Sequence, residues 1–172
     1  RRAKSFVKHI INNYDSPDEL DLLIISHFHE DHIKGISELV KRIKTIKEVV
    51  VPYLHPYERL LVAGSILSRL GRSASTLDYV SLVLDPVSYF GEDRKTSVRF
   101  IWPGSPDDQP LDQRENQIND VEQIPRTVYW NIRSPSELDK GLDPRRHISD
   151  YSSLTAYTWQ FKFYCRKEFK KS

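Results

Sequence analysis

The apolar positions of the first 71 residues switch between helical spacing and short continuous runs. Apolar residues at i, i+3, i+4 and i+7 indicate helices, and uninterrupted aliphatic runs indicate strands that are buried on both faces. The predicted elements are helices over residues 3–14, 36–43 and 56–70 and strands over residues 21–26 and 48–52. Gly71 stands where the third helix should end. This alternation of helix and strand predicts an α/β layered domain.

The second half of the chain has a less regular pattern. Residues 77–84 fit either a helix or a strand, and residues 97–102 fit a strand that ends at a proline. Residues 105–126 are rich in Asp, Gln, Asn and Pro, which predicts a long surface loop or insertion. Over residues 157–163 aromatic and polar residues alternate, which is typical of a strand with one buried aromatic face.

Composition excludes several classes of protein. Of the 172 residues, 38% are hydrophobic and 29% are charged, which is the balance of a folded globular domain. The apolar runs are far shorter than the roughly 20 residues that span a bilayer, so no membrane segment is expected. Cys165 is the single cysteine, which excludes an internal disulfide and favours a reducing, cytoplasmic location. The net charge of +2 is too small to indicate nucleic-acid binding by itself.

A cluster of metal-ligating side chains follows directly on the first predicted strand. His27, His29, Asp31 and His32 lie within six residues, a pattern that a random shuffle would produce in roughly 6 of 10,000 cases. On extended backbone His27 and His29 project to the same side and can share one ion. The turn into the next helix would bring Asp31 and His32 toward a neighbouring position. Imidazole and carboxylate suit zinc, with manganese or iron as alternatives, and two ions roughly 3.5–4 Å apart can share a nucleophilic hydroxide.

This stretch resembles the signature of the metallo-β-lactamase fold superfamily. The matching residues are Ile25-Ser26-His27-Phe28-His29-Glu30-Asp31-His32-Ile33-Lys34-Gly35. The resemblance implies an α/β fold of the four-layer αββα sandwich type, with the motif after a core strand. It also implies one or two zinc ions: His27 and His29 would bind the first metal, and Asp31 and His32 the second. Asp31 would in addition be catalytic, because it would orient the attacking water.

Two further segments are similar to one branch of that superfamily, the hydrolase domain of competence DNA-uptake proteins. They are the predicted strand that ends at Pro103 and the residues 150–154 that lead into the aromatic strand. This likeness implies a metal-dependent hydrolase whose metal-bound hydroxide attacks phosphodiester bonds of nucleic acid or nucleotides. Hydrolysis of a lactam or a thioester is a less favoured alternative.

The chain departs from the family pattern at both ends. No turn of the Asp-Cys-Gly kind precedes residue 3, and no Gly-Asp element with a bridging carboxylate follows residue 164. The chain also contains no Met. We therefore expect one domain over residues 1–172 that is a fragment, incomplete at both ends. The alternative function is a catalytically incomplete module that serves as a scaffold for a protein partner.

Other candidate residues have plainer explanations. His147 could add a further ligand to the first metal, but the neighbouring Arg145 and Arg146 favour a solvent-facing segment. His55 follows the second predicted strand and could contact a substrate, although an ordinary loop histidine explains it better. Four basic residues in and just after the predicted helix over residues 36–43 could meet phosphates, yet a solvated helix face explains them equally well. These are Lys41, Arg42, Lys44 and Lys47.

Overall fold

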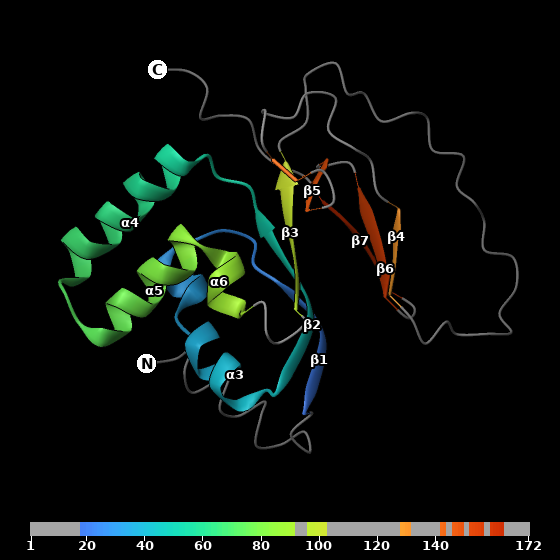
Figure 1. Ribbon diagram of the computed structural model, residues 1–172, viewed down its shortest axis with the longest axis horizontal. Helices are drawn as coiled ribbons and strands as arrows, with labels where there is room; N and C mark the ends of the chain where they lie inside the picture. Colours follow the sequence, from blue (N-terminus) through green and yellow to red (C-terminus); the bar gives the residue numbers. More distant parts are fainter. Residues whose placement is uncertain are drawn as a thin grey trace, which may run out of the picture. The chain divides into compact units, whose positions relative to one another are not determined.

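The structure is a computed structural model (Figure 1). The chain divides into two compact units, Arg1–Arg99 and Phe100–Ser172. The residues that it describes are 18–91, 96–102, 128–131, 142–143, 146–149, 152–156 and 159–163. The predicted helix over residues 3–14, the predicted polar loop over residues 105–126 and Cys165 lie outside these ranges. No helix among the described residues is long and apolar enough to cross a membrane.

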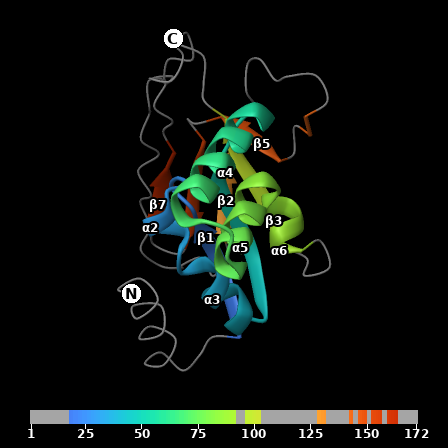
Figure 2. The same ribbon diagram turned by 90° about the vertical axis from the view of Figure 1, so that its left-hand side faces the viewer.

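The first unit alternates strands and helices, as the sequence predicts. Its elements are β1 (Glu19–Ile24), α2 (Glu30–Ile33), α3 (Ile36–Arg42), β2 (Thr45–Pro52), α4 (Pro56–Leu70), α5 (Ala74–Leu84), α6 (Pro86–Phe90) and the start of β3 (Ser97–Trp102). Strands β1 and β2 pair in parallel, with Leu20 opposite Ile46 and Ile24 opposite Val50. A parallel pair needs a crossover connection, which α2 and α3 supply. Helices α3 to α6 lie on one side of these two strands (Figures 1 and 2).

The buried centre of this unit is β2. Its Val49, Val50 and Val51 are at most 1% exposed, which is typical of a parallel strand covered on both faces. The carboxylate of Glu48, also buried in β2, accepts a hydrogen bond from the Arg99 guanidinium of β3. A buried carboxylate needs such a partner, because an unpaired charge away from water is costly.

Strand β1 is more exposed than its apolar sequence predicts. Most of its residues are half-buried, and Ile24 is 37% exposed. The expectation that this strand is buried on both faces is therefore wrong. The physical reason is its position, because the strand order β1-β2-β3-β5 puts β1 at the end of the described sheet.

The third predicted helix has the bounds that local signals dictate. Pro56 occupies the first turn of α4, where its missing N–H costs nothing. The Nδ1 atom of His55 accepts the Tyr57 N–H at 3.3 Å, and the Glu58 carboxylate accepts the His55 N–H at 2.7 Å. This reciprocal arrangement is a capping box. At the other end Gly71 adopts a φ of 69°, a left-handed conformation that favours glycine.

The ambiguous segment over residues 77–84 belongs to helix α5. Ser73 caps this helix, since its Oγ accepts the Thr76 N–H at 3.1 Å. Leu82 and Val83 are fully buried, and Tyr79 is 4% exposed. The cap precedes the apolar run, so a helix is favoured over a strand there.

The second unit contains the rest of β3 and two kinds of strand pairing. Strand β5 (His147–Ser149) pairs in parallel with β3, with Phe100 opposite His147. Strands β4 (Val128–Asn131), β6 (Ser153–Ala156) and β7 (Trp159–Lys162) form an antiparallel sheet in the order β4-β6-β7. The predicted alternation is confirmed where it is described, because Gln160 and Lys162 are exposed while Phe161 is half-buried. The strand predicted over residues 157–163 corresponds to β7, which covers Trp159–Lys162.

Candidate functional site

The candidate site begins where β1 ends. The Ile25 N–H donates to the Val50 carbonyl at 2.8 Å, which extends the pairing of the two strands one residue into the loop. Ile25 and Phe28 are buried, 4% and 6% exposed, whereas His27 is half-buried and His29 is exposed. On extended backbone successive side chains point to opposite sides, so burying Phe28 leaves its two histidine neighbours on the accessible side.

A single helical turn then brings the rest of the motif back over the loop. The His29 carbonyl accepts the N–H groups of His32 and Ile33, at 3.0 and 3.2 Å. Ile33 is fully buried and anchors this short helix. As a result the His32 ring lies over the His27 ring, with 3.8 Å between their centroids.

The four predicted ligands form one cluster at this turn. The His27 ring is 4.8 Å from the His29 ring, and His32 Nε2 is 3.6 Å from Asp31 Oδ2. Asp31 is the most exposed of the second pair, with 80% of its side chain open to solvent against 48% for His32. The turn into α2 therefore places the His32 ring beside His27 and the Asp31 carboxylate beside His32.

The surroundings of His27 favour its neutral form. Burial lowers the pKa of His27, and the nearby His32 and His29 lower it further. Metal ions bind the neutral form of histidine, so this shift keeps His27 in the competent form at lower pH. The Ser26 hydroxyl lies 2.9 Å from His27 Nδ1, which orients the ring and directs a ligand role to Nε2.

The types of donor atom in the cluster suit a divalent metal ion. The orientations of the side chains do not yet form a coordination site. Three imidazoles and one carboxylate are the ligands that zinc and related ions take in proteins. Within the described ranges, no three His, Cys, Asp or Glu side chains form a set that could hold an ion as they stand. The fit to a metal therefore rests on the donor chemistry and on the gathering of the four side chains.

His147, the predicted extra ligand, occupies a buried position in the second unit. It is 6% exposed, so the expectation of a solvent-facing segment is wrong. Its ring stacks on Phe100 with centroids 5.0 Å apart, and its Nδ1 lies 2.8 Å from the Asp143 carbonyl oxygen. Strand pairing and this stacking bury it despite the adjacent arginines. A ligand role for His147 stays a prediction.

Three of the four basic residues that could have met phosphates are engaged with acidic neighbours. Lys47 Nζ lies 2.8 Å from Asp21 Oδ1, and Lys44 Nζ lies 2.9 Å from Asp18 Oδ1. Arg42 Nε donates to Glu38 at 2.8 Å, one helical turn away. These contacts support a solvated surface over a phosphate-binding patch.

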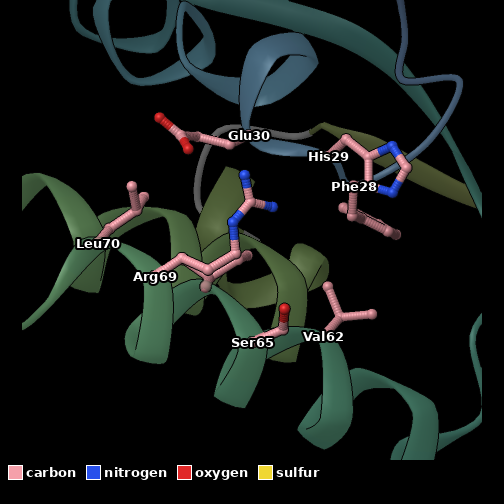
Figure 3. A pocket seen from close by; sticks show the side chains of 8 residues that line it. Phe28, His29, Glu30, Val62, Ser65, Arg69 and Leu70 are labelled. Atoms are coloured by element: carbon pink, nitrogen blue, oxygen red, sulfur yellow. The ribbon is translucent and has the colours of Figure 1, made fainter.

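A pocket of about 150 Å³ opens between the motif and helix α4 (Figure 3). The motif contributes Phe28, His29 and Glu30 to its lining, and α4 contributes Val62, Ser65, Ile66, Arg69 and Leu70. The α4 residues follow the spacing i, i+3, i+4, i+7 and i+8, so they form one stripe of the helix. Sequence reasoning missed Ser65 and Arg69. The signal that could have found them is their place on the same stripe as apolar Val62 and Ile66.

Comparison with known proteins gives one family. Residues 4–125 match the family model of the metallo-beta-lactamase superfamily. No curated protein and no solved structure gives a significant match. The matched range covers well over half of the chain and includes the whole motif with both of its flanking elements. The protein therefore belongs to the metallo-beta-lactamase superfamily and has the metal-dependent hydrolase fold of that family.

Proposed function

We propose that this protein hydrolyses phosphodiester bonds of nucleic acid or nucleotides, with one or two divalent metal ions at the motif over residues 27–32. The observation that carries the proposal is the cluster at the end of β1. There three imidazole rings lie 3.8 and 4.8 Å apart, and a carboxylate stands beside His32. A structural loop has no chemical need for four ligand side chains in contact.

Each residue of the cluster has a distinct role in this proposal. His27 and His29 hold the first ion, and Asp31 and His32 hold the second, with zinc favoured over manganese or iron. When bound, such an ion lowers the pKa of its water to about 7 and polarises a phosphoryl oxygen. The exposed Asp31 carboxylate accepts a hydrogen bond from the attacking water and orients it, while Ser26 holds the His27 ring.

The substrate class rests on a resemblance and on charge. The segment that ends at Pro103 is similar to the hydrolases of competence DNA-uptake proteins, and its strand is present as β3. The pocket beside the motif is lined by a guanidinium, that of Arg69, which suits an anionic substrate. Neither a lactam nor a thioester brings a phosphate group with it, so such substrates would use this guanidinium less.

The direct test is hydrolysis of bis(4-nitrophenyl) phosphate by the protein loaded with zinc or manganese. We expect turnover that a chelator abolishes and that added metal restores. Asp31→Asn should lower kcat by about 100-fold or more, because loss of an outer-shell partner alone costs roughly 10- to 100-fold. A folded, metal-loaded protein without activity on any phosphodiester would refute the substrate class.

Absence of stoichiometric metal in a folded protein would overturn the enzyme itself. The remaining function would then be the scaffold for a protein partner. A protein that cleaves a lactam or a thioester but no phosphodiester would keep the enzyme and replace the substrate.

A further inference from the structure

Arg69 lies on the stripe of α4 that faces the motif. Its guanidinium points across the pocket toward the loop that carries His29 and Glu30 (Figure 3). A basic residue in the last turn of a helix is favourable for the helix dipole wherever its side chain points. The dipole therefore accounts for the residue type but not for its direction into the pocket.

The acidic residue of the pocket lining, Glu30, already has a partner. The Glu30 carboxylate pairs with the Lys34 ammonium one helical turn away. Among the residues that the structure describes, none forms an ion pair with Arg69. The charges of Lys34 and Glu30 cancel, so the guanidinium of Arg69 leaves a net charge of +1 at the pocket.

The other lining groups suit a small anion with an apolar edge. Ser65 stands one turn before Arg69 on the same stripe, and its hydroxyl points into the pocket (Figure 3). The guanidinium presents its N–H donors in a planar fork that matches two phosphate oxygens. A volume of about 150 Å³ is enough for a benzene-sized molecule, so this pocket has room for one phosphate group.

The pocket adjoins the motif without containing all of it. Of the four predicted ligands, His29 lines the pocket, whereas His27, Asp31 and His32 do not. An anion bound by Arg69 would therefore lie beside the reacting centre.

We propose that Arg69 and Ser65 bind a phosphate group that flanks the phosphodiester to be cleaved. This inference rests on the proposed function and deepens it. The preferred substrates are then oligonucleotides or nucleotides with a second phosphate next to the scissile one, and simple diesters with one phosphate are poorer substrates.

The activity test compares three dinucleotides with the same scissile bond. They are dTpdT with no flanking phosphate, pdTpdT with a 5′ phosphate and dTpdTp with a 3′ phosphate. We expect one of the two phosphorylated forms to have the lowest KM. Arg69→Gln should raise that KM about 10- to 100-fold and raise the KM of dTpdT much less. Arg69→Lys keeps the charge without the fork and should fall between the two.

A binding test needs no metal and no turnover. Thymidine 5′-monophosphate is titrated into metal-free protein, and the dissociation constant is measured by NMR shifts. Arg69→Gln should weaken binding about 10-fold or more. Arg72→Gln is the matched control, because Arg72 is exposed just beyond α4 and does not line the pocket. It should leave both KM and binding unchanged.

The outcomes separate this inference from the proposed function. Equal effects of Arg69→Gln and Arg72→Gln, or no effect of either, would overturn the flanking-phosphate site. Nucleotide binding that depends on Arg69 in a protein without phosphodiesterase activity would support the anion site and overturn the proposed function. Unchanged binding in both Arg69→Gln and Arg69→Lys would overturn the site even if one variant were less stable.

Discussion

Strands β1 and β2 lie side by side in parallel, and each ends in a loop whose last residue is a histidine at a helix N-cap. His55 caps α4 with its ring, since Nδ1 accepts the Tyr57 N–H at 3.3 Å. His29 occupies the same position before α2, but its side chain makes no capping hydrogen bond. The two positions are alike in backbone and differ in what the ring does. At His55 the ring stabilises a helix, and at His29 it joins a cluster of potential ligands.

The helices α2 and α4 that follow these histidines differ in what stabilises their ends. Helix α4 has a capping box, a proline in its first turn and a glycine after its end. Helix α2 has four residues and no side-chain cap, and so short a helix is not stable by its own hydrogen bonds. Burial of Phe28 and Ile33 holds it instead. The buried side chains of Phe28 and Ile33 thus position the motif, and its polar side chains are not needed for capping.

The largest effect should separate these two histidines. His29→Ala should lower kcat on bis(4-nitrophenyl) phosphate by about 100-fold or more, because it removes one of the proposed metal ligands. His55→Ala should leave kcat unchanged and lower the free energy of unfolding by about 1 kcal/mol, since it removes a cap. Steady-state kinetics and urea unfolding measure the two quantities. If both variants lost activity equally, the comparison would fail.

The next effect concerns the anchors of the motif. Ile33→Ala should lower the free energy of unfolding by about 2–5 kcal/mol, because Ile33 is fully buried and a cavity would replace it. Leu60→Ala is the control, since Leu60 is 61% exposed and should change stability by less than about 0.5 kcal/mol. Urea unfolding of both variants checks this prediction. Similar stability losses would show that α2 is not held by burial.

A third cap gives a pH-dependent effect of intermediate size. Ser88 donates to the Asp85 carboxylate through its backbone N–H and its hydroxyl, at 3.1 and 2.6 Å, and these hydrogen bonds lower the pKa of Asp85 below 3.8. The carboxylate therefore stabilises the fold above pH 3.8, and this contribution disappears as the pH falls through the lowered pKa.

Asp85→Ala should cost about 1 kcal/mol at pH 7 and progressively less as the pH falls below 3.8. Urea unfolding at a series of pH values measures this difference. A cost for Asp85→Ala that grows toward low pH would contradict the assigned cap.

The smallest effect concerns the basic residues outside the pocket. Arg42→Gln removes a pair with Glu38 one turn away and should change stability by about 0.5 kcal/mol or less. It should leave KM for every dinucleotide unchanged, in contrast to Arg69→Gln. A raised KM for Arg42→Gln would move the phosphate-binding surface to α3.

Features that depend on neighbouring residues in the sequence, such as helix ends and the position of the motif, could be predicted. Features that depend on contacts between distant segments could not. The bounds of α4 follow from Pro56 and Gly71, and the motif follows from its spacing after β1. The exposure of β1 depends on its place in the sheet, which the run of apolar residues does not encode. His147 is buried by a strand pairing with β3, and β5 has three residues, too few to show periodicity.

The lining of the pocket also could not be predicted from the sequence. Ser65 and Arg69 were not predicted as site residues, because α4 faces the motif only after the chain has folded. The helical stripe that holds them was visible in the sequence, but its partner was not. The four candidate ligands could be predicted from residue type and spacing, whereas the residues that line the pocket beside them could not.

Metal content per chain, measured by elemental mass spectrometry, tests the central claim most directly. The account predicts one or two zinc or manganese ions per protein molecule. It also predicts their loss in His27→Ala and His29→Ala, and their retention in His55→Ala. A folded protein without stoichiometric metal, or one whose metal survives both motif substitutions, would contradict it.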